Sequence, residues 1–166
     1  MTIYLDMDGV IANFFGFWAD SCGVSHWKTI KDKEKALIDL HGTDFFNRIP
    51  KFEETDQIVS FVKYISKGDW GICSSPLRGD TMNSAYWKRV WLERHGIVTP
   101  DVERMVFTSN KSKYAISQID GKPNILIDDK ISNIKAWEAA GGIGIRFQAD
   151  LDDVPEYLFE ELKKKV

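Results

Sequence analysis

Five short apolar runs divide this chain, and the stretches between them are long enough to form helices. The runs are Ile3–Leu5, Trp70–Cys73, Met105–Thr108, Ile125–Ile127 and Ile143–Phe147. Apolar runs of this length are typical of strands buried in a parallel sheet. Helices are expected at 56–67, 81–95, 132–140 and 154–165. This alternation predicts an α/β fold with a doubly wound parallel sheet, a Rossmann-like core that carries helices on both faces.

The segment 13–50 departs from this alternation. It contains two helical stretches, 14–21 and 31–40, with no strand between them. We therefore expect a small helical cap, inserted after the first strand and lying over the carboxyl ends of the strands. A chain of 166 residues suits one domain of ordinary size with one small insertion. Residues 1–166 are therefore expected to form a single domain.

Composition excludes several classes of protein. Apolar residues make up 43% of the chain, yet no apolar run approaches the roughly 18 residues that a membrane-spanning helix needs. The net charge of -3 gives no field that would attract long nucleic acids. No basic leader segment precedes the first strand, and Cys22 and Cys73 are expected to be core residues, not a disulfide framework. The expected location is the cytoplasm.

Chemically active residue types follow the ends of the expected strands. Asp6 and Asp8 come directly after the first run, and their spacing places both side chains on the same side of an extended segment. Later runs are followed by Ser74-Ser75-Pro76, Thr108-Ser109-Asn110-Lys111 and Asp128-Asp129. Because the carboxyl ends of parallel strands border one crevice, these side chains are expected to gather there.

Aspartates gathered in this way need cations beside them. Two like charges about 4 Å apart repel by roughly 4 kcal/mol at an effective dielectric constant of about 20. Lys111 offsets one charge, and a hard divalent cation with oxygen ligands would offset the rest. No His or Cys group has the spacing of a zinc site, so Mg²⁺ is the expected ion. Each motif alone is often only a turn or a helix cap, but their order and strand context together indicate phosphoryl transfer.

In this order the motifs resemble those of the haloacid dehalogenase superfamily, in which Asp-x-Asp, a serine, a lysine and an aspartate pair follow successive strands. Within it, the chain is similar to the 5'(3')-deoxyribonucleotidase family. The similarity is carried by Asp6-Met7-Asp8-Gly9-Val10, Ile72-Cys73-Ser74-Ser75-Pro76-Leu77, Trp91-Leu92-Glu93, Phe107-Thr108-Ser109-Asn110-Lys111-Ser112 and Leu126-Ile127-Asp128-Asp129-Lys130. It covers nearly the whole chain and is weakest in the insertion.

The resemblance implies a role for each catalytic side chain. Asp6 would attack phosphorus as the nucleophile, while Asp8 would protonate the departing oxygen and later activate water. Ser74, Ser75 and Lys111 would hold the nonbridging phosphate oxygens and stabilise the charge that spreads over them in the transition state.

The resemblance also implies a Mg²⁺ ion that screens the attacking carboxylate from the phosphate. Its ligands would be Asp6, the backbone carbonyl of Asp8, and one or both of Asp128 and Asp129. The motif leaves open which of the two later aspartates contacts the metal.

Substrate-binding residues are expected in and near the insertion. Phe14 matches a family position that lines the base pocket, and Trp27 is a candidate for a second wall, since aromatic faces stack on nucleobases. Arg78 could contact a base or the phosphate. The alternatives are core packing for the two aromatic residues and a solvated surface position for the arginine.

The sequence therefore predicts a Mg²⁺-dependent phosphatase that hydrolyses nucleoside monophosphates, deoxy forms foremost, through an aspartyl-phosphate. One alternative is a phosphatase for another small phosphate or a 3'-phosphate end. Another is a binding module that kept the fold and lost turnover. Members of the family are often homodimers, although no sequence patch here indicates one.

Overall fold

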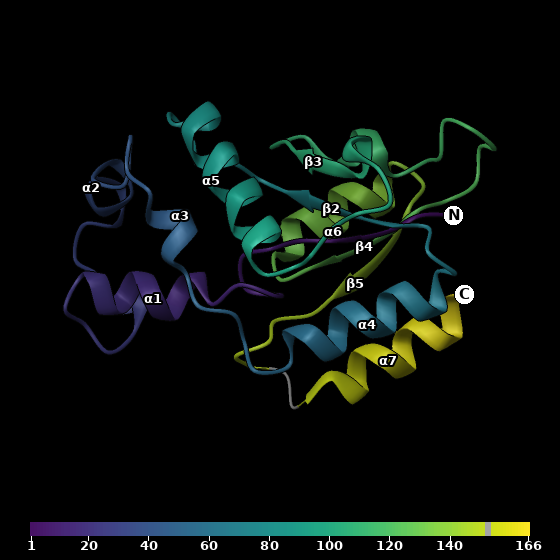
Figure 1. Cartoon of the computed structure of the whole chain (residues 1–166), viewed down its shortest axis with the longest axis horizontal. Coiled ribbons are helices and arrows are strands. Elements are labelled where there is room, and N and C mark those ends of the chain that lie inside the picture. The colour runs from purple at the N-terminus through teal and green to yellow at the C-terminus, as the bar shows by residue number, and fades with distance from the viewer. Residues whose placement is uncertain (152–153) are drawn as a thin grey trace.

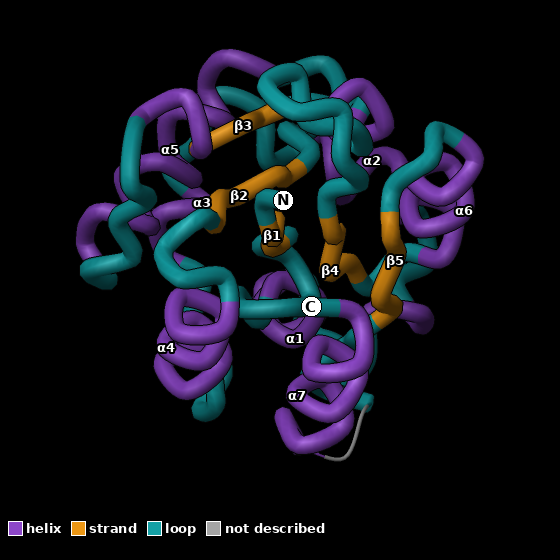
Figure 2. The backbone as a smooth tube through the Cα atoms, turned by 90° about the vertical axis from the view of Figure 1, so that its right-hand side faces the viewer, coloured by secondary structure: helices purple, strands orange, loops and turns teal. Residues whose placement is uncertain are grey.

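The computed structural model describes residues 1–151 and 154–166 and is built around a five-stranded parallel sheet. The strand order is β3-β2-β1-β4-β5, which places β1 at the centre (Figure 1, Figure 2). The strands are β1 (Ile3–Leu5), β2 (Trp70–Ser74), β3 (Met105–Phe107), β4 (Ile125–Asp128) and β5 (Ile143–Arg146). The predicted doubly wound α/β fold is confirmed, and each expected strand is present within one residue at either end.

Helices fill the connections between the strands. They are α1 (Phe14–Ser21), α2 (Lys33–Ile38), α3 (Phe45–Arg48), α4 (Thr55–Ile65), α5 (Thr81–Arg94), α6 (Ile131–Ala139) and α7 (Val154–Lys165), with 3-10 turns η1 (Trp27–Thr29), η2 (Val102–Arg104) and η3 (Lys111–Tyr114). The four helices expected outside the insertion are α4 to α7. Within the described residues, no helix is both long and apolar enough to cross a membrane.

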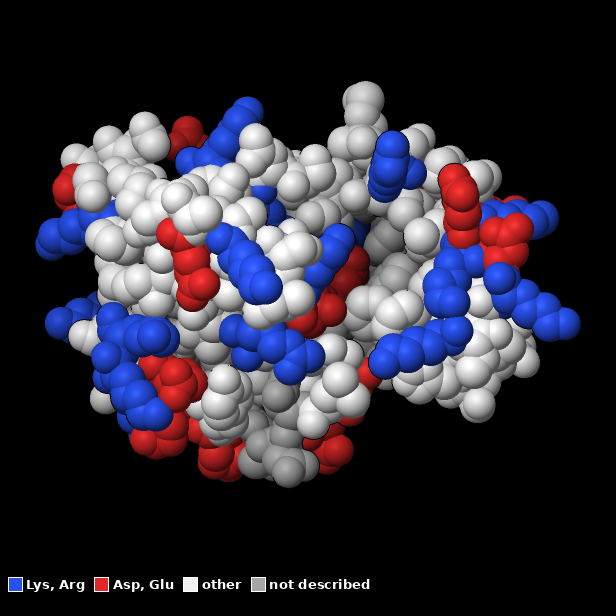
Figure 3. Space-filling model, turned by 180° about the vertical axis from the view of Figure 1, so that it is seen from behind, with Lys and Arg blue, Asp and Glu red and all other residues white. Residues whose placement is uncertain are grey.

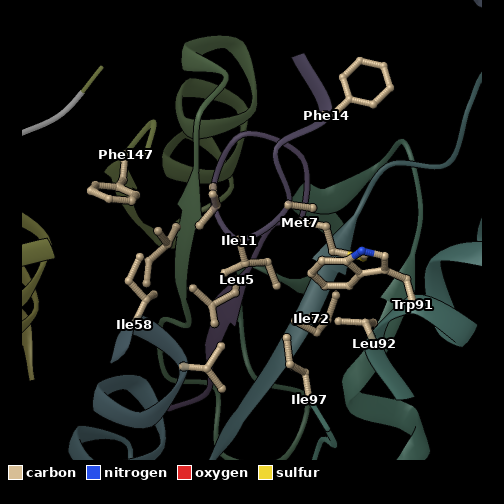
Figure 4. Close-up of a cluster of buried hydrophobic side chains, with 14 of the residues drawn as sticks. Leu5, Met7, Ile11, Phe14, Ile58, Ile72, Trp91, Leu92, Ile97 and Phe147 are labelled. Carbon is tan, nitrogen blue, oxygen red and sulfur yellow. The ribbon is translucent and has the colours of Figure 1, made fainter. Parts of the chain in front are cut away.

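Alternate residues of the strands face two separate hydrophobic clusters, as the two-residue period of a strand requires. Ile3 and Leu5 belong to the larger cluster, which also contains buried residues of α4, α5 and α7. Tyr4 points the other way and packs with Trp137 of α6. Figure 4 shows the larger cluster, with Phe14 at its outer margin. The sheet is therefore covered on both faces, and its carboxyl edge is left for the site.

The insertion after β1 is present, and it holds one helix more than expected. The second helix is Lys33–Ile38 and not 31–40, because the Asp32 side chain accepts a hydrogen bond from the Lys35 backbone N–H and caps the first turn. The short helix α3 was not expected, since four residues are too few to give a periodic pattern.

Side chains of α5 tie the end of the insertion to the core. Asn83 donates from its amide nitrogen to the Thr43 carbonyl at 2.9 Å, and the Trp91 indole donates to the Ile49 carbonyl at 2.6 Å. Trp91 is fully buried, so its bond to Ile49 is shielded from water, whereas the Asn83 bond is only partly buried. The insertion is thus fixed against the helix that follows β2 (Figure 1).

The two cysteines have different surroundings. Cys73 is buried in β2, as expected, and burial raises the pKa of its thiol to about 12. Cys22 is exposed at the carboxyl end of α1, so the expectation that it is a core residue is wrong. The helix has ended at Ser21, and its buried face is supplied by Phe14, Trp18 and Ala19.

Candidate active site

The carboxyl ends of β1 and β4 bring three carboxylates together. Asp6 directly follows β1, Asp128 ends β4, and Asp129 is the next residue. One oxygen from each of the three lies within 4.8 Å of the others. The two strands are hydrogen-bonded neighbours, so their ends adjoin and the side chains that follow them share one space, as expected from the sequence.

Lys111 is the cation of this cluster. Its ammonium lies 3.0 Å from Asp6 Oδ2 and 2.6 Å from Asp128 Oδ2, and the residue is only 3% exposed. Burial opposes the charge on Lys111, but the two carboxylates outweigh it, and the pKa of the ammonium is raised. Lys111 therefore stays charged and balances part of the negative charge.

The hydrogen bonds to Asp128 occupy both of its carboxylate oxygens. Oδ1 accepts from the Lys130 backbone N–H at 2.8 Å, and Oδ2 accepts from Lys111. The Asn133 side-chain amide donates to both oxygens, at 3.1 and 3.0 Å. Asp128 is fully buried, so these donors fix its orientation and leave it little capacity for a further ligand.

Asp129 lies in a different electrostatic environment. Burial and the neighbouring carboxylates, Asp6 foremost, raise the pKa of Asp129 to about 8. Its carboxyl group packs on Gly9, where an added Cβ would lie 2.9 Å from the Asp129 side chain, and Gly9 has a φ of 80°. Glycine is needed here both for the backbone conformation and for the close approach of Asp129. The cluster without a metal ion therefore carries more negative charge than Lys111 balances.

Asp8 has its own cation, Lys88 of α5, which sequence reasoning missed. The Lys88 ammonium lies 2.7 Å from Asp8 Oδ2, and Lys88 is fully buried. Burial raises the pKa of Asp8, while the Lys88 charge acts in the opposite direction. A signal was present in the sequence, because Lys88 lies one helical turn from Trp91 and Leu92 on the buried face of α5. A lysine at such a position needs a buried anion.

We call these charged side chains at the carboxyl edge of the sheet the charged rim. Its members are Asp6, Asp8, Lys88, Lys111, Asp128 and Asp129.

A pocket of about 400 Å³ opens from the charged rim toward the insertion. It is lined by Asp6, Asp8 and Asp129 of the rim and by three aromatic residues of the insertion, which we call the aromatic wall: Phe14, Phe15 and Trp27. Further polar lining comes from Ser75, Lys130, Asn133 and Gln148. Figure 3 shows acidic side chains deep in a hollow of the surface, with basic side chains around its mouth.

The other predicted site residues are not all in this pocket. Ser75 lines it, whereas Ser74 is fully buried and its hydroxyl accepts a hydrogen bond from Lys88 at 3.0 Å. Arg78 is exposed and lines a different groove, beside α2, where its backbone carbonyl lies 3.1 Å from His41 Nε2. Phe15 completes the aromatic wall and was not singled out from the sequence.

Phe14 combines the two interpretations that the sequence left open. It is 8% exposed and packs on Phe46 in a stacked arrangement, with ring centroids 5.8 Å apart, yet it also lines the pocket. Trp27 is half-buried and lies against Phe15, with ring centroids 5.1 Å apart. The pocket therefore has an apolar side that is continuous with the packing of the insertion.

No protein-family model matches this chain, and no curated protein is significantly similar to it. Solved structures are similar. One is the HAD-hydrolase YfnB of Bacillus subtilis bound to magnesium, with 12% identity, a TM-score of 0.55, and coverage of 93% of this chain and 90% of that chain. Another is a HAD family hydrolase of Deinococcus radiodurans with bound phosphate and sodium, with 13% identity, a TM-score of 0.56, and coverage of 97% and 87%.

A predicted phosphatase of Clostridium acetobutylicum is also similar, with 10% identity, a TM-score of 0.56, and coverage of 98% of each chain. At identities this low, the likeness shows the fold. The chain has the fold of haloacid dehalogenase hydrolases, and it carries a cluster of aspartates, Asp6, Asp128 and Asp129, that could hold a metal ion.

Proposed function

We propose that this protein is a Mg²⁺-dependent phosphomonoesterase that hydrolyses nucleoside monophosphates, deoxy forms foremost, through an aspartyl-phosphate. The observation that carries the proposal is the charged rim, in which buried carboxylates and lysines open into a pocket with an aromatic wall. Removing a charged side chain from water costs on the order of several kcal/mol, and pairing offsets this cost only when its geometry is excellent. A rim of this kind is therefore better explained by chemistry than by stability.

The proposed reaction has two successive displacements at phosphorus, and residues of the charged rim act in both. Asp6 attacks phosphorus, the bond to the nucleoside oxygen breaks, and Asp8 gives that oxygen a proton. Water then attacks the phosphorus of the aspartyl-phosphate while Asp8 takes up a proton of the water; the bond between the Asp6 oxygen and phosphorus breaks, which restores the Asp6 carboxylate and releases inorganic phosphate. The raised pKa of Asp8 favours the protonated form that the first displacement needs.

The donor set suits a hard divalent cation. Mg²⁺ prefers oxygen ligands such as carboxylates, and carboxylate oxygens of Asp6 and Asp129 lie within 4.8 Å of each other. Mg²⁺ would reduce the repulsion between the attacking carboxylate and the phosphate. We assign its ligands to Asp6, the Asp8 backbone carbonyl and Asp129.

Asp128 is assigned a different role. Lys111, Lys130 and Asn133 already donate to both of its oxygens, whereas the raised pKa of Asp129 reports negative charge that needs a cation. Asp128 would thus hold Lys111 in place, and Lys111 would stabilise the charge on the transferring phosphoryl group together with Ser75.

The aromatic wall supports the choice of a nucleotide. Stacking of a base on an aromatic side chain contributes about 1 to 3 kcal/mol, and Phe15 and Trp27 line the same pocket as Asp6, where the phosphate would be held. A pocket for a small sugar phosphate has no need of this apolar surface.

The test is a phosphate-release screen with Mg²⁺ over dTMP, dUMP, AMP, sugar phosphates and a 3'-phosphorylated oligonucleotide. We expect the nucleoside monophosphates to be hydrolysed fastest, and excess chelator to stop turnover. Equal rates on all substrates would remove the nucleotide assignment. Release from none of them, by protein that melts cooperatively, would favour the binding module.

A further inference from the structure

We propose that Lys88 is a positioning residue that holds Asp8 in the orientation needed to protonate the leaving group. The inference rests on the proposed phosphatase function and adds to it a residue outside the motifs that suggested that function. It follows from the contacts of a single ammonium group.

All three N–H groups of Lys88 are directed at acceptors of the protein. They donate to Asp8 Oδ2 at 2.7 Å, to Ser74 Oγ at 3.0 Å and to the Ser75 carbonyl at 2.9 Å. An ammonium has three donors and no acceptor. Lys88 is 0% exposed and does not line the pocket, so no donor is left for a phosphate oxygen. Lys88 can act only through the residues it contacts, and Asp8 is the one that it meets with the shortest hydrogen bond.

The Lys88 contact distinguishes the two oxygens of Asp8. Oδ2 is held by the ammonium, while Oδ1 is buried and has no hydrogen-bond partner among the described residues. Asp8 lines the pocket beside Asp6. Since Oδ2 accepts from Lys88, Oδ1 is the oxygen left to hold the proton, and the Lys88 contact fixes the rotation of the carboxyl group.

Lys88 is itself held by the insertion. Its ammonium lies 5.0 Å from the centroid of the Phe46 ring, and that ring stacks on Phe14 of the aromatic wall. A cation over an aromatic face is stabilised when both are shielded from water. The same lysine thus contacts the acid of the reaction and the packing behind the substrate pocket.

The role of Lys88 can be measured by comparing two substrates whose leaving groups differ in their need for a proton. When Asp6 forms its bond to phosphorus, the P–O bond to the leaving oxygen breaks and its electron pair takes the proton from Asp8 Oδ1. A nucleoside oxygen needs that proton, because an alkoxide is a poor leaving group. p-Nitrophenolate leaves as an anion and needs none. Loss of Lys88 should therefore slow hydrolysis of the nucleotide far more than hydrolysis of p-nitrophenyl phosphate.

The experiment compares kcat/KM for dUMP and for p-nitrophenyl phosphate in Lys88→Met and in the parent. General acid catalysis contributes about 10²- to 10⁴-fold, so we expect the dUMP to p-nitrophenyl phosphate ratio to fall at least about 30-fold. The ratio is measured on one preparation, so partial misfolding cancels. Lys113→Met, which removes an exposed lysine, should leave the ratio unchanged. An equal loss on both substrates would overturn the proposal.

A second measurement tests whether Lys88 acts through Asp8. In Asp8→Asn the acid is already absent, so adding Lys88→Met should change the substrate ratio less than about threefold. A further large fall would show that Lys88 has another role and would overturn the proposal. If the parent hydrolysed neither substrate, the proposed function itself would fail, which is a different outcome from either result with Lys88.

Discussion

The charged rim and the insertion above it are both buried, but burial means different things in the two regions. Asp6, Asp128 and Lys111 are charged groups at 6% exposure or less, where charges cost stability unless they are paired. Phe14 and Phe46 are equally buried, and there they gain stability by packing. Buried charge therefore indicates function, whereas buried aromatic surface is compatible with structure alone and needs a substrate-dependent test.

The largest difference in effect on kcat between the rim and the insertion is expected from Asp6→Asn. The amide is not a nucleophile, so kcat should fall by more than about 10³-fold, as for other nucleophile deletions. The melting temperature should stay near that of the parent, because the cluster loses one of its excess negative charges while Lys111 keeps its ion pair with Asp128. Phosphate release from dUMP measures the first effect, and thermal unfolding measures the second.

Asp20→Asn is the matched control in the insertion. Asp20 is exposed on α1, so the same chemical change there should leave kcat unaltered. Activity of Asp6→Asn within tenfold of the parent would remove Asp6 from the assigned role.

The next largest effect is expected from Lys111→Met. Removing one partner of a buried charge pair costs about 3 to 5 kcal/mol, and Asp6 and Asp128 would lose the ammonium that lies within 3.0 Å of both. Loss of a preorganised positive group should also lower kcat by about 10²- to 10³-fold. Urea unfolding and steady-state kinetics measure the two effects. A Lys111→Met protein as stable and active as Lys113→Met would contradict both assignments.

The ends of the strands explain why most of the rim was predictable from sequence. Asp6, Lys111 and Asp128 each follow a short apolar run, and the rule that parallel strands end at one edge places them together. Lys88 is different, because it reaches the rim from a helix face. Its spacing from Trp91 and Leu92 indicates the buried face of α5, but the anion that it meets depends on how that helix packs, which no local pattern records.

The aromatic wall was less predictable for a similar reason. Phe14 and Phe15 are adjacent on α1, and which of them faces the pocket depends on the rotation of that helix about its axis. Both line it, although Phe14 is buried and Phe15 is only half-buried. The short α3 contributes Phe45 and Phe46 to the packing behind them, and its presence could not be read from four residues.

Truncation of the aromatic wall should lower kcat/KM moderately, and for the nucleotide more than for a phosphate without a base. Phe15→Ala and Trp27→Ala remove side chains that line the pocket, and loss of about 1 to 3 kcal/mol of stacking lowers kcat/KM for dUMP by about 5- to 150-fold. Ribose 5-phosphate has no base, so its kcat/KM should change less than about threefold by the same reasoning. Parallel kinetics on the two substrates measure the selectivity.

Phe17→Ala is the control for this pair. Phe17 belongs to α1 and packs on Phe45, but it does not line the pocket. Phe17→Ala should lower the free energy of unfolding and leave the preference for dUMP over ribose 5-phosphate unchanged. An equal loss on dUMP and ribose 5-phosphate in both wall variants would show that Phe15 and Trp27 serve packing, as the rest of the insertion does.

The last prediction concerns the free energy of unfolding as a function of pH, with no effect on turnover. The pKa of Asp129 is about 8 in the folded protein, raised by burial and by its neighbours from its ordinary value of 3.8. Between these values the folded protein keeps the Asp129 proton while the unfolded chain loses it. The free energy of unfolding of the metal-free protein should therefore fall as the pH rises from about 4 to about 8.

Mg²⁺ should act against this loss, since it binds the ionised carboxylate and competes with the proton at lower pH. A shift of the melting temperature by a few degrees, about 1 kcal/mol of stabilisation at Mg²⁺ concentrations a few times the dissociation constant, is expected at pH 8.5, and a smaller one at pH 5.5. Asp129→Asn should reduce the pH slope, to which Asp8 with its raised pKa still contributes, and should remove most of the Mg²⁺ response. Equal Mg²⁺ shifts of the melting temperature at the two pH values would contradict the assignment, because Mg²⁺ has to displace the Asp129 proton at pH 5.5. An unchanged Mg²⁺ response in Asp129→Asn would likewise assign the metal to another carboxylate.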